Sequence, residues 1–102
     1  MKGNSVLTNK IECEIELLQT HVQMLKAIRE NEPIGIIRLS ELLVYPQHKV
    51  RYSLRILEQE GLIKPSPEGA VTTDKLKVFM DQLKVILDDM EKTVKELKAQ
   101  LV

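Results

Sequence analysis

The sequence has very little cysteine, and its single thiol, Cys13, cannot form a disulfide within the chain. Proteins of a reducing cytosol do without disulfides, so we expect a cytoplasmic protein. No apolar run approaches the roughly 18 residues that a membrane-spanning helix needs. The opening "MKGNSVLTNK" has no signal-peptide core. We therefore expect no membrane partner.

An excess of charge of either sign is missing as well. Fifteen basic residues balance fifteen acidic ones, for a formal net charge of +0. A protein that coats nucleic acid nonspecifically would be strongly basic, so any nucleic-acid role must depend on a local patch. The length of 102 residues and the apolar fraction of 43% fit one soluble globular domain with one long appended element.

Motifs for catalysis and for metal or cofactor binding are absent from the sequence. His21 and His48 are far apart, and no Cys/His cluster has metal-ligand spacing. We find no phosphate-binding glycine loop, no nucleophile with a paired base and no paired catalytic carboxylates. We therefore expect neither an enzyme nor a resident cofactor. His21 is interpreted as a hydrogen-bonded interface histidine, a position from which it can also sense pH.

What the sequence does contain is a regular succession of helices and breaks. The apolar spacing predicts a first helix that runs to about Asn31, capped by Thr8 or Asn9. It carries two apolar stripes, Ile11, Ile15, Leu18, Val22 and Leu25 on one side and Leu17, Met24 and Ile28 about 120° away. One stripe is expected to face the chain's own core. The other is expected to face a partner chain or the last helix.

The middle of the chain predicts two shorter helices and a hairpin. Gly35 can cap "IIRLSELL", and Pro46 suits the first turn of a third helix that Gly61 ends. "LIKP" and "AVTT" are predicted to be strands joined by the turn "SPEG". On the third helix, Val50, Leu54 and Leu57 are predicted to lie in the core.

The last helix is predicted from Asp74 to Leu101, after a cap at Thr73, and it has the strongest periodicity. Its heptad has Leu76, Leu83, Met90 and Leu97 at d, and Met80, Leu87, Val94 and Leu101 at a. Every slot is apolar, which is the pattern of a coiled coil. Phe79 and Ile86 at g, with Val78 and Val85 at f, widen the apolar face of its first half, which is expected to pack on the globular body.

This helix, about 40 Å long, would overhang a domain about 26 Å across. An exposed apolar seam on the overhang predicts a homodimer. The seam from Met90 onward is expected to meet its mate, and the predicted dimerisation residues are Leu83, Leu87, Met90, Val94, Leu97 and Leu101.

The segment "RLSELLVYPQHKVRYSLRILEQEGLI", followed by "AVTTDK", resembles the corresponding part of the archaeal and bacterial winged helix-turn-helix transcriptional regulators of the MarR/ArsR-like group. The resemblance covers residues 34–76. It implies a mainly α fold with a two-stranded β-wing, a DNA-binding domain over residues 1–73 and a dimerisation helix over residues 74–102. It places the third helix in the major groove of double-stranded DNA. Carried over by position, the DNA-contacting residues would be Gln47, His48, Lys49, Arg51, Tyr52 and Arg55, with Lys64 on the wing.

Three departures from the family pattern affect these expectations. Val44 stands where such turns usually have glycine, which predicts a turn of different shape. Pro46 replaces the usual Ser/Thr cap, and the wing tip "PSPEG" carries Glu68 and no arginine, which predicts weak reading by the wing.

A second function therefore stays open, that of a protein-interaction module which docks into a larger assembly without binding DNA. Neutral net charge and the acidic wing favour this module. The cations of the third helix, with no acid before Glu58, favour a DNA-binding regulator. The sequence identifies no operator, no small-molecule effector and no choice between repression and activation.

Overall fold

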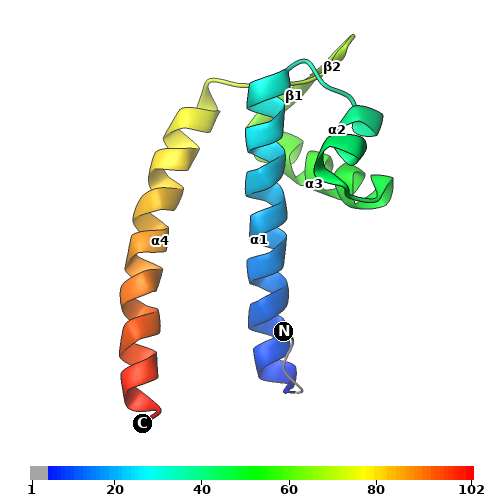
Figure 1. The fold of residues 1–102 in the computed structure, drawn as a ribbon. Helices are drawn as coiled ribbons and strands as arrows, with labels where there is room; N and C mark the ends of the chain where they lie inside the picture. Colours follow the sequence, from blue (N-terminus) through cyan, green and yellow to red (C-terminus); the bar gives the residue numbers. More distant parts are fainter. Residues whose placement is uncertain (1–4) are drawn as a thin grey trace.

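The computed structural model describes residues 5–102, so the first four residues of the predicted domain over residues 1–73 lie outside it. The elements follow in the order α1 (Val6–Asn31), α2 (Ile36–Leu43), α3 (Gln47–Gln59), β1 (Ile63–Ser66), β2 (Gly69–Thr72) and α4 (Lys75–Gln100). The prediction of a mainly α chain with a two-stranded antiparallel sheet and a long C-terminal helix is confirmed (Figure 1). The molecule is elongated, measuring 54 × 30 × 20 Å.

Three of the four helix starts differ from the predicted ones by one to four residues, and α2 begins at Ile36 as predicted. Helix α1 begins at Val6, because the Ser5 side chain accepts a hydrogen bond from the Leu7 N–H at 3.1 Å. The predicted caps Thr8 and Asn9 lie inside the helix, so that prediction is wrong. At α4 the Thr73 hydroxyl accepts the Lys75 N–H at 3.3 Å, although Asp74 occupies the cap position itself.

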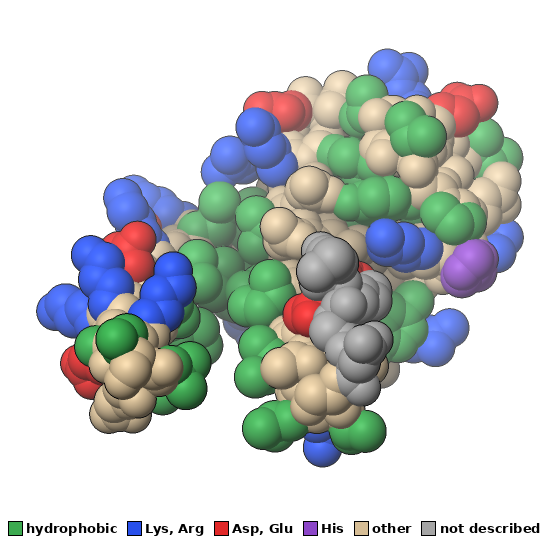
Figure 2. Space-filling model, turned by 60° about the horizontal axis from the view of Figure 1, so that its bottom comes forward, with side chains coloured by type: hydrophobic (Ala, Val, Ile, Leu, Met, Phe, Trp, Pro, Cys, Tyr) green, Lys and Arg blue, Asp and Glu red, His purple; other side chains and the backbone are tan. Residues whose placement is uncertain are grey.

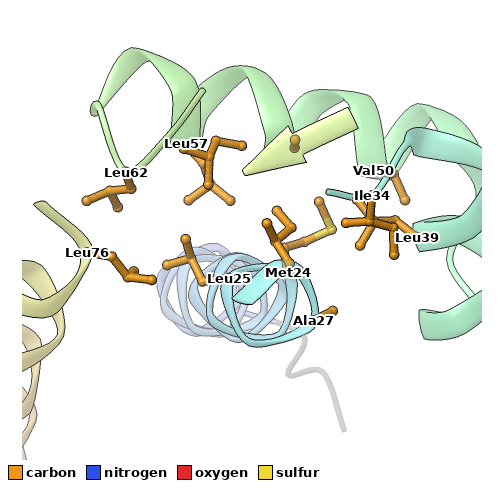
Figure 3. Close-up of a cluster of buried hydrophobic side chains, with 12 residues drawn as sticks. Met24, Leu25, Ala27, Ile34, Leu39, Val50, Leu57, Leu62 and Leu76 are labelled. Atoms are coloured by element: carbon orange, nitrogen blue, oxygen red, sulfur yellow. The ribbon is translucent and has the colours of Figure 1, made fainter. Parts of the chain in front are cut away.

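The core lies where the C-terminal half of α1 meets α2, α3 and the hairpin (Figure 3). Its buried apolar residues are Met24, Leu25, Ala27, Ile28, Ile34, Leu39, Val50, Leu57, Leu62, Ile63, Ala70 and Leu76. Val50 and Leu57 are buried as predicted. Leu54 is only half-buried against the edge of this cluster, so its prediction as a core residue is wrong. The wholly buried Ser53 faces α1 in its place, because a small side chain suits the contact between the two helices.

Gly61 ends α3 as predicted and turns the chain into the hairpin. It has φ 74, and its N–H donates to the Glu58 carbonyl at 2.9 Å. The Leu62 N–H donates to the Leu57 carbonyl at 3.0 Å, which completes a Schellman closure. Leu62 is thereby folded back into the core.

The hairpin is fastened to the segment that links α1 and α2. Ile34 and Ala70 exchange two backbone hydrogen bonds of 3.2 and 2.8 Å across an antiparallel bridge. Gly69, at φ 136, lies so close that an added Cβ would be less than 3.0 Å from the backbone of Ile34 and Gly35. The Glu32 carboxylate also accepts the Thr72 N–H at 2.7 Å. These contacts fix where the hairpin stands beside α2 and α3.

The turn between α2 and α3 contains a residue in the left-handed backbone conformation, although that residue is a valine and not a glycine. Val44 has φ 56 and ψ 46, and its N–H donates to the Ser40 carbonyl. The Ser40 hydroxyl donates to the Tyr45 carbonyl across the same turn. The expectation of a different turn shape is therefore wrong. Hydrogen bonds on both sides hold Val44 in a conformation that costs a β-branched residue roughly 1–3 kcal/mol.

Helix α4 leaves the body and runs beside α1, with the first turn of α1 and the last turn of α4 at the same end (Figure 1). Leu76 is buried and Phe79 and Met80 pack partly on the core, as expected for its first half. Val78, Val85 and Ile86 are exposed, however, so the predicted wide packing face is wrong. The α4 backbone approaches those of the other described elements closely at few points or none. In the described part of the chain, no helix combines the length and apolar character needed to cross a bilayer.

Candidate nucleic-acid interface

The solvent side of α3 presents the six residues that the resemblance singles out. Gln47, His48, Lys49, Arg51, Tyr52 and Arg55 are all exposed, while Val50, Ser53 and Leu57 are buried on the opposite side. Successive residues turn by about 100° around a helix. The six side chains therefore spread over the whole outer arc and form two flanks with a strip between them.

The first flank of α3 lies beside α2. The Arg51 guanidinium donates to the Gln47 side-chain oxygen at 3.3 Å. Both residues line a shallow hollow with Arg38 and Glu41 of α2. Arg38 is a further cation at this surface that the sequence interpretation missed, because only the packing of α2 on α3 brings it next to Arg51.

The second flank of α3 is tied to α1. The Lys49 ammonium lies 4.3 Å from the centroid of the Tyr45 ring, and the Tyr45 hydroxyl donates to the side chain of Gln23 on α1. The Tyr52 ring stacks on the His21 ring with centroids 6.4 Å apart and planes 26° apart. These contacts restrict where Lys49 and Tyr52 can point.

His48 and Arg55 occupy the strip between the flanks. They are seven residues apart, so they point in nearly the same direction, away from the core. The hairpin adds one charge of each sign. Lys64 lies exposed on β1 opposite Val71, and Glu68 lies exposed at the tip. The positive charge of the surface therefore comes from α3 and α2 and not from the hairpin.

His21 joins α1 to α3 through a buried hydroxyl group. Its Nδ1 lies 2.7 Å from the Oγ of Ser53, and either atom can donate according to the imidazole tautomer. Ser53 is wholly buried, so this bond satisfies a polar group at the helix contact. Burial lowers the pKa of His21 below its ordinary value of 6.5. The interpretation of His21 as a hydrogen-bonded interface histidine is confirmed.

This environment makes stability depend on pH. As the pH falls below about 6.5, the unfolded chain takes up a proton at His21 before the folded chain does. The unfolded state then binds more protons, so the free energy of unfolding falls, and the loss is complete below the folded pKa. We expect His21→Gln to flatten this decline between about pH 7.5 and about pH 5.5. Urea titrations across this range measure the effect.

Gln19→Ala is the matched control for this prediction, because Gln19 is exposed two residues earlier on the same helix. The control should keep the wild-type pH dependence. If His21→Gln also keeps it, the contact between His21 and Ser53 does not carry the titration.

Of the predicted dimerisation residues, Leu83, Leu87, Met90 and Val94 line hollows between α4 and α1. Leu83 is half-buried, and Leu87, Met90, Val94, Leu97 and Leu101 are exposed by 42–86%. Figure 2 shows apolar side chains on α4 and α1 facing one another across an open space. The structure thus brings the α4 seam opposite the Ile11 stripe of α1, whereas the sequence assigned the distal seam to a second copy alone.

Within residues 5–102, no three histidine, cysteine or acidic side chains are grouped as a metal site would require. Cys13 is exposed on α1. In comparisons with known proteins, no family model matches the chain and no curated protein is significantly similar to it.

Proposed function

We propose that this protein is a homodimeric, sequence-specific DNA-binding transcriptional regulator of the winged helix-turn-helix type. In this proposal α2 and α3 form the helix-turn-helix, β1 and β2 form the wing, and α3 enters the major groove. The observation that carries it is the outer arc of α3. Three cations, with Gln47, His48 and Tyr52, are exposed there over a well-packed core.

The chemistry of this arc suits a nucleic-acid duplex. Arginine makes paired hydrogen bonds to guanine edges or to phosphate oxygens. Arg51, held by Gln47 near the start of α3, is our candidate for reading bases. Arg55, one turn further along, is our candidate for a phosphate on the groove wall. The exposed N-terminus of α3 adds a positive field that attracts phosphate.

The residues tied to α1 complete the proposed contact. Lys49 and Tyr52 are held in place by the Tyr45 and His21 rings, so they lose little freedom when they meet a phosphate backbone. Lys64 is assigned a minor role, since the negative charge of Glu68 at the hairpin tip repels the DNA phosphates. Two α3 helices in a dimer would read half-sites about 34 Å apart, one turn of the duplex.

A module that docks into a protein assembly is the competing function. The balanced charge of the whole chain and the acidic hairpin tip favour it. Salt dependence separates the two functions, because only contacts to phosphates release condensed counterions.

We expect wild-type protein to bind mixed duplex DNA with a steep dependence on salt. A dimer that sets Lys49, Arg51 and Arg55 of each copy against phosphates would neutralise about six charges. Its log–log slope would then be about −5, and affinity would fall about a thousandfold between 50 and 200 mM salt. Fluorescence anisotropy with a labelled duplex at several salt concentrations measures the slope. Negligible binding even at low salt would instead support the docking module.

A further inference from the structure

His21 lies at the contact between α1 and α3, one aromatic ring away from the surface that we propose meets DNA. Its Nδ1 lies 2.7 Å from the Oγ of the buried Ser53, and its ring stacks on the Tyr52 ring with centroids 6.4 Å apart. Tyr52 itself is 46% exposed on the outer arc of α3. The imidazole is therefore partly shielded from water, yet it is close to any group that contacts Tyr52.

The α1 side of this contact carries no charge near the imidazole. The residues three and four positions away from His21 along the helix are all apolar, namely Leu17, Leu18, Met24 and Leu25. The nearest charged residues of α1, Glu16 and Lys26, each lie five positions away and therefore about 140° round the helix. Helix α1 thus supplies no carboxylate beside the ring.

The α3 side of the contact is basic. His48 and Lys49 precede Tyr52 by four and three positions, and Arg55 follows it by three, so all of them lie one turn from Tyr52. Tyr45, in the turn before α3, is the other titratable side chain there, and its ring centroid lies 4.3 Å from the Lys49 ammonium. None of these neighbours is an acid. In the free protein an imidazolium at this contact would find no opposite charge among them.

A bound duplex would reverse this balance. In the proposed complex, phosphates lie against Lys49, Tyr52 and Arg55. A phosphate about 10 Å from the imidazole, at an effective dielectric constant of about 20, shifts its protonation equilibrium roughly tenfold toward the imidazolium. The phosphates also neutralise the neighbouring cations, which acts in the same direction.

Protonation leaves the hydrogen bond between His21 and Ser53 in place. An imidazolium carries hydrogen on both ring nitrogens. Its Nδ1 then donates to the Oγ of Ser53, whichever tautomer the neutral ring adopts. Helix α3 stays joined to α1, so protonation changes the charge at this contact and keeps the bond.

We propose that each α3 takes up one proton from solvent at His21 when it binds a duplex, so that affinity for DNA rises as the pH falls. This inference rests on the proposed function, because it requires phosphates beside Tyr52. The sign follows from linkage, since the state that binds more protons, here the DNA complex, is favoured in acid. Acid therefore has opposite effects on the two equilibria, because it lowers the stability of the free chain and strengthens the complex.

Substitution of the two histidines separates their contributions. His48→Gln leaves His21 as the only imidazole of the chain. At constant ionic strength, the affinity of this variant for a labelled mixed duplex should rise roughly three- to tenfold per half-site between about pH 8 and about pH 5.5. Adding His21→Gln should remove most of that rise, because glutamine can hydrogen-bond to Ser53 but does not titrate. Fluorescence anisotropy measures the affinity, and far-UV circular dichroism at each pH checks the fold.

A nuclear magnetic resonance titration of the His48→Gln variant tests the proton directly and does not need the doubly substituted protein to fold. The midpoint for the His21 ring protons should move to higher pH when saturating unlabelled duplex is added. An unmoved midpoint, or the same pH dependence of affinity with and without His21, would overturn the inference while salt-dependent binding keeps the proposed function in place.

An affinity that falls in acid only when His21 is present would also overturn the inference, because the imidazolium would then loosen α3. Failure to bind the duplex at any pH, even at low salt, would remove the proposed function together with this inference.

Discussion

Arg51→Ala should weaken binding to a specific duplex by about 5- to 150-fold per half-site, which corresponds to about 1–3 kcal/mol for a lost bidentate base contact. The preference for one base should be relaxed at the same time, because we propose that Arg51, hydrogen-bonded to Gln47 at the start of α3, contacts a base edge. The measurement is a titration against the specific duplex and against duplexes changed at single positions. A selected pool of bound sequences supplies the specific site.

Arg55→Ala is expected to behave differently, because we assign Arg55 to a phosphate. The substitution should weaken binding to all DNA sequences alike. It should also reduce the slope of log affinity against log salt concentration by about one charge per half-site. The position of Arg55 on the middle strip of α3 allows the reverse assignment, in which Arg55 reads a base and Arg51 holds a phosphate. The comparison of base preference with salt slope in the two variants decides between these assignments.

A control that removes cations far from α3 distinguishes local contacts from the general field of the protein. Lys92→Ala and Lys98→Ala remove two exposed cations from α4, far along the chain from α3. The doubly substituted control should bind nearly as well as wild type. Unchanged titrations for both arginine variants would mean that α3 does not contact DNA, and the docking module would then become the preferred function.

Leu57→Ala should lower the free energy of unfolding by about 2–5 kcal/mol, the usual range for a buried leucine. The Leu57 side chain is 3% exposed and belongs to the central cluster. Its carbonyl also accepts the bond from Leu62 that closes α3 onto β1. This loss is large relative to the total, because the free energy of unfolding of a small domain is only about 5–15 kcal/mol. Urea-induced unfolding followed by circular dichroism measures it.

Leu54→Ala provides the internal comparison for this prediction. Leu54 is half-buried at the edge of the same cluster, so its truncation should cost clearly less than that of Leu57. Equal losses at the two positions, or a loss below about 1 kcal/mol at Leu57, would contradict the burial pattern of α3.

The elements of this fold could be predicted because each depends on local signals. Glycine is the residue type that reaches a φ of 74 without strain, so Gly61 marked the end of α3. The heptad spacing marked α4, and the turn residues between two short β-prone segments marked the hairpin. The outward placement of Arg51 and Arg55 followed from their spacing relative to Val50 and Leu57.

What escaped prediction depends on contacts between distant segments. Ser53 is polar and would be assigned to the surface by its type, yet His21, 32 residues earlier, makes its burial favourable. Arg38 joins the α3 surface only through the packing of α2. Val44 adopts a left-handed conformation that its own preference opposes, because flanking hydrogen bonds dictate it. The periodicity of each helix alone left open whether an apolar stripe of α1 faces the last helix or a partner chain, and the structure places the α4 seam opposite α1.

The paired hydrogen bonds between Ile34 and Ala70 should open far more slowly than those in the last turns of α4. These two amides are shielded in the core, so they can exchange with solvent only when the hairpin detaches from the linker and the core opens with it. Amides in the last turns of α4 have no such shield and open by fraying at the helix end. In a monomer, we therefore expect amide exchange to become faster along α4 toward its C-terminus. The change should begin after Leu76, the last buried residue of the described chain.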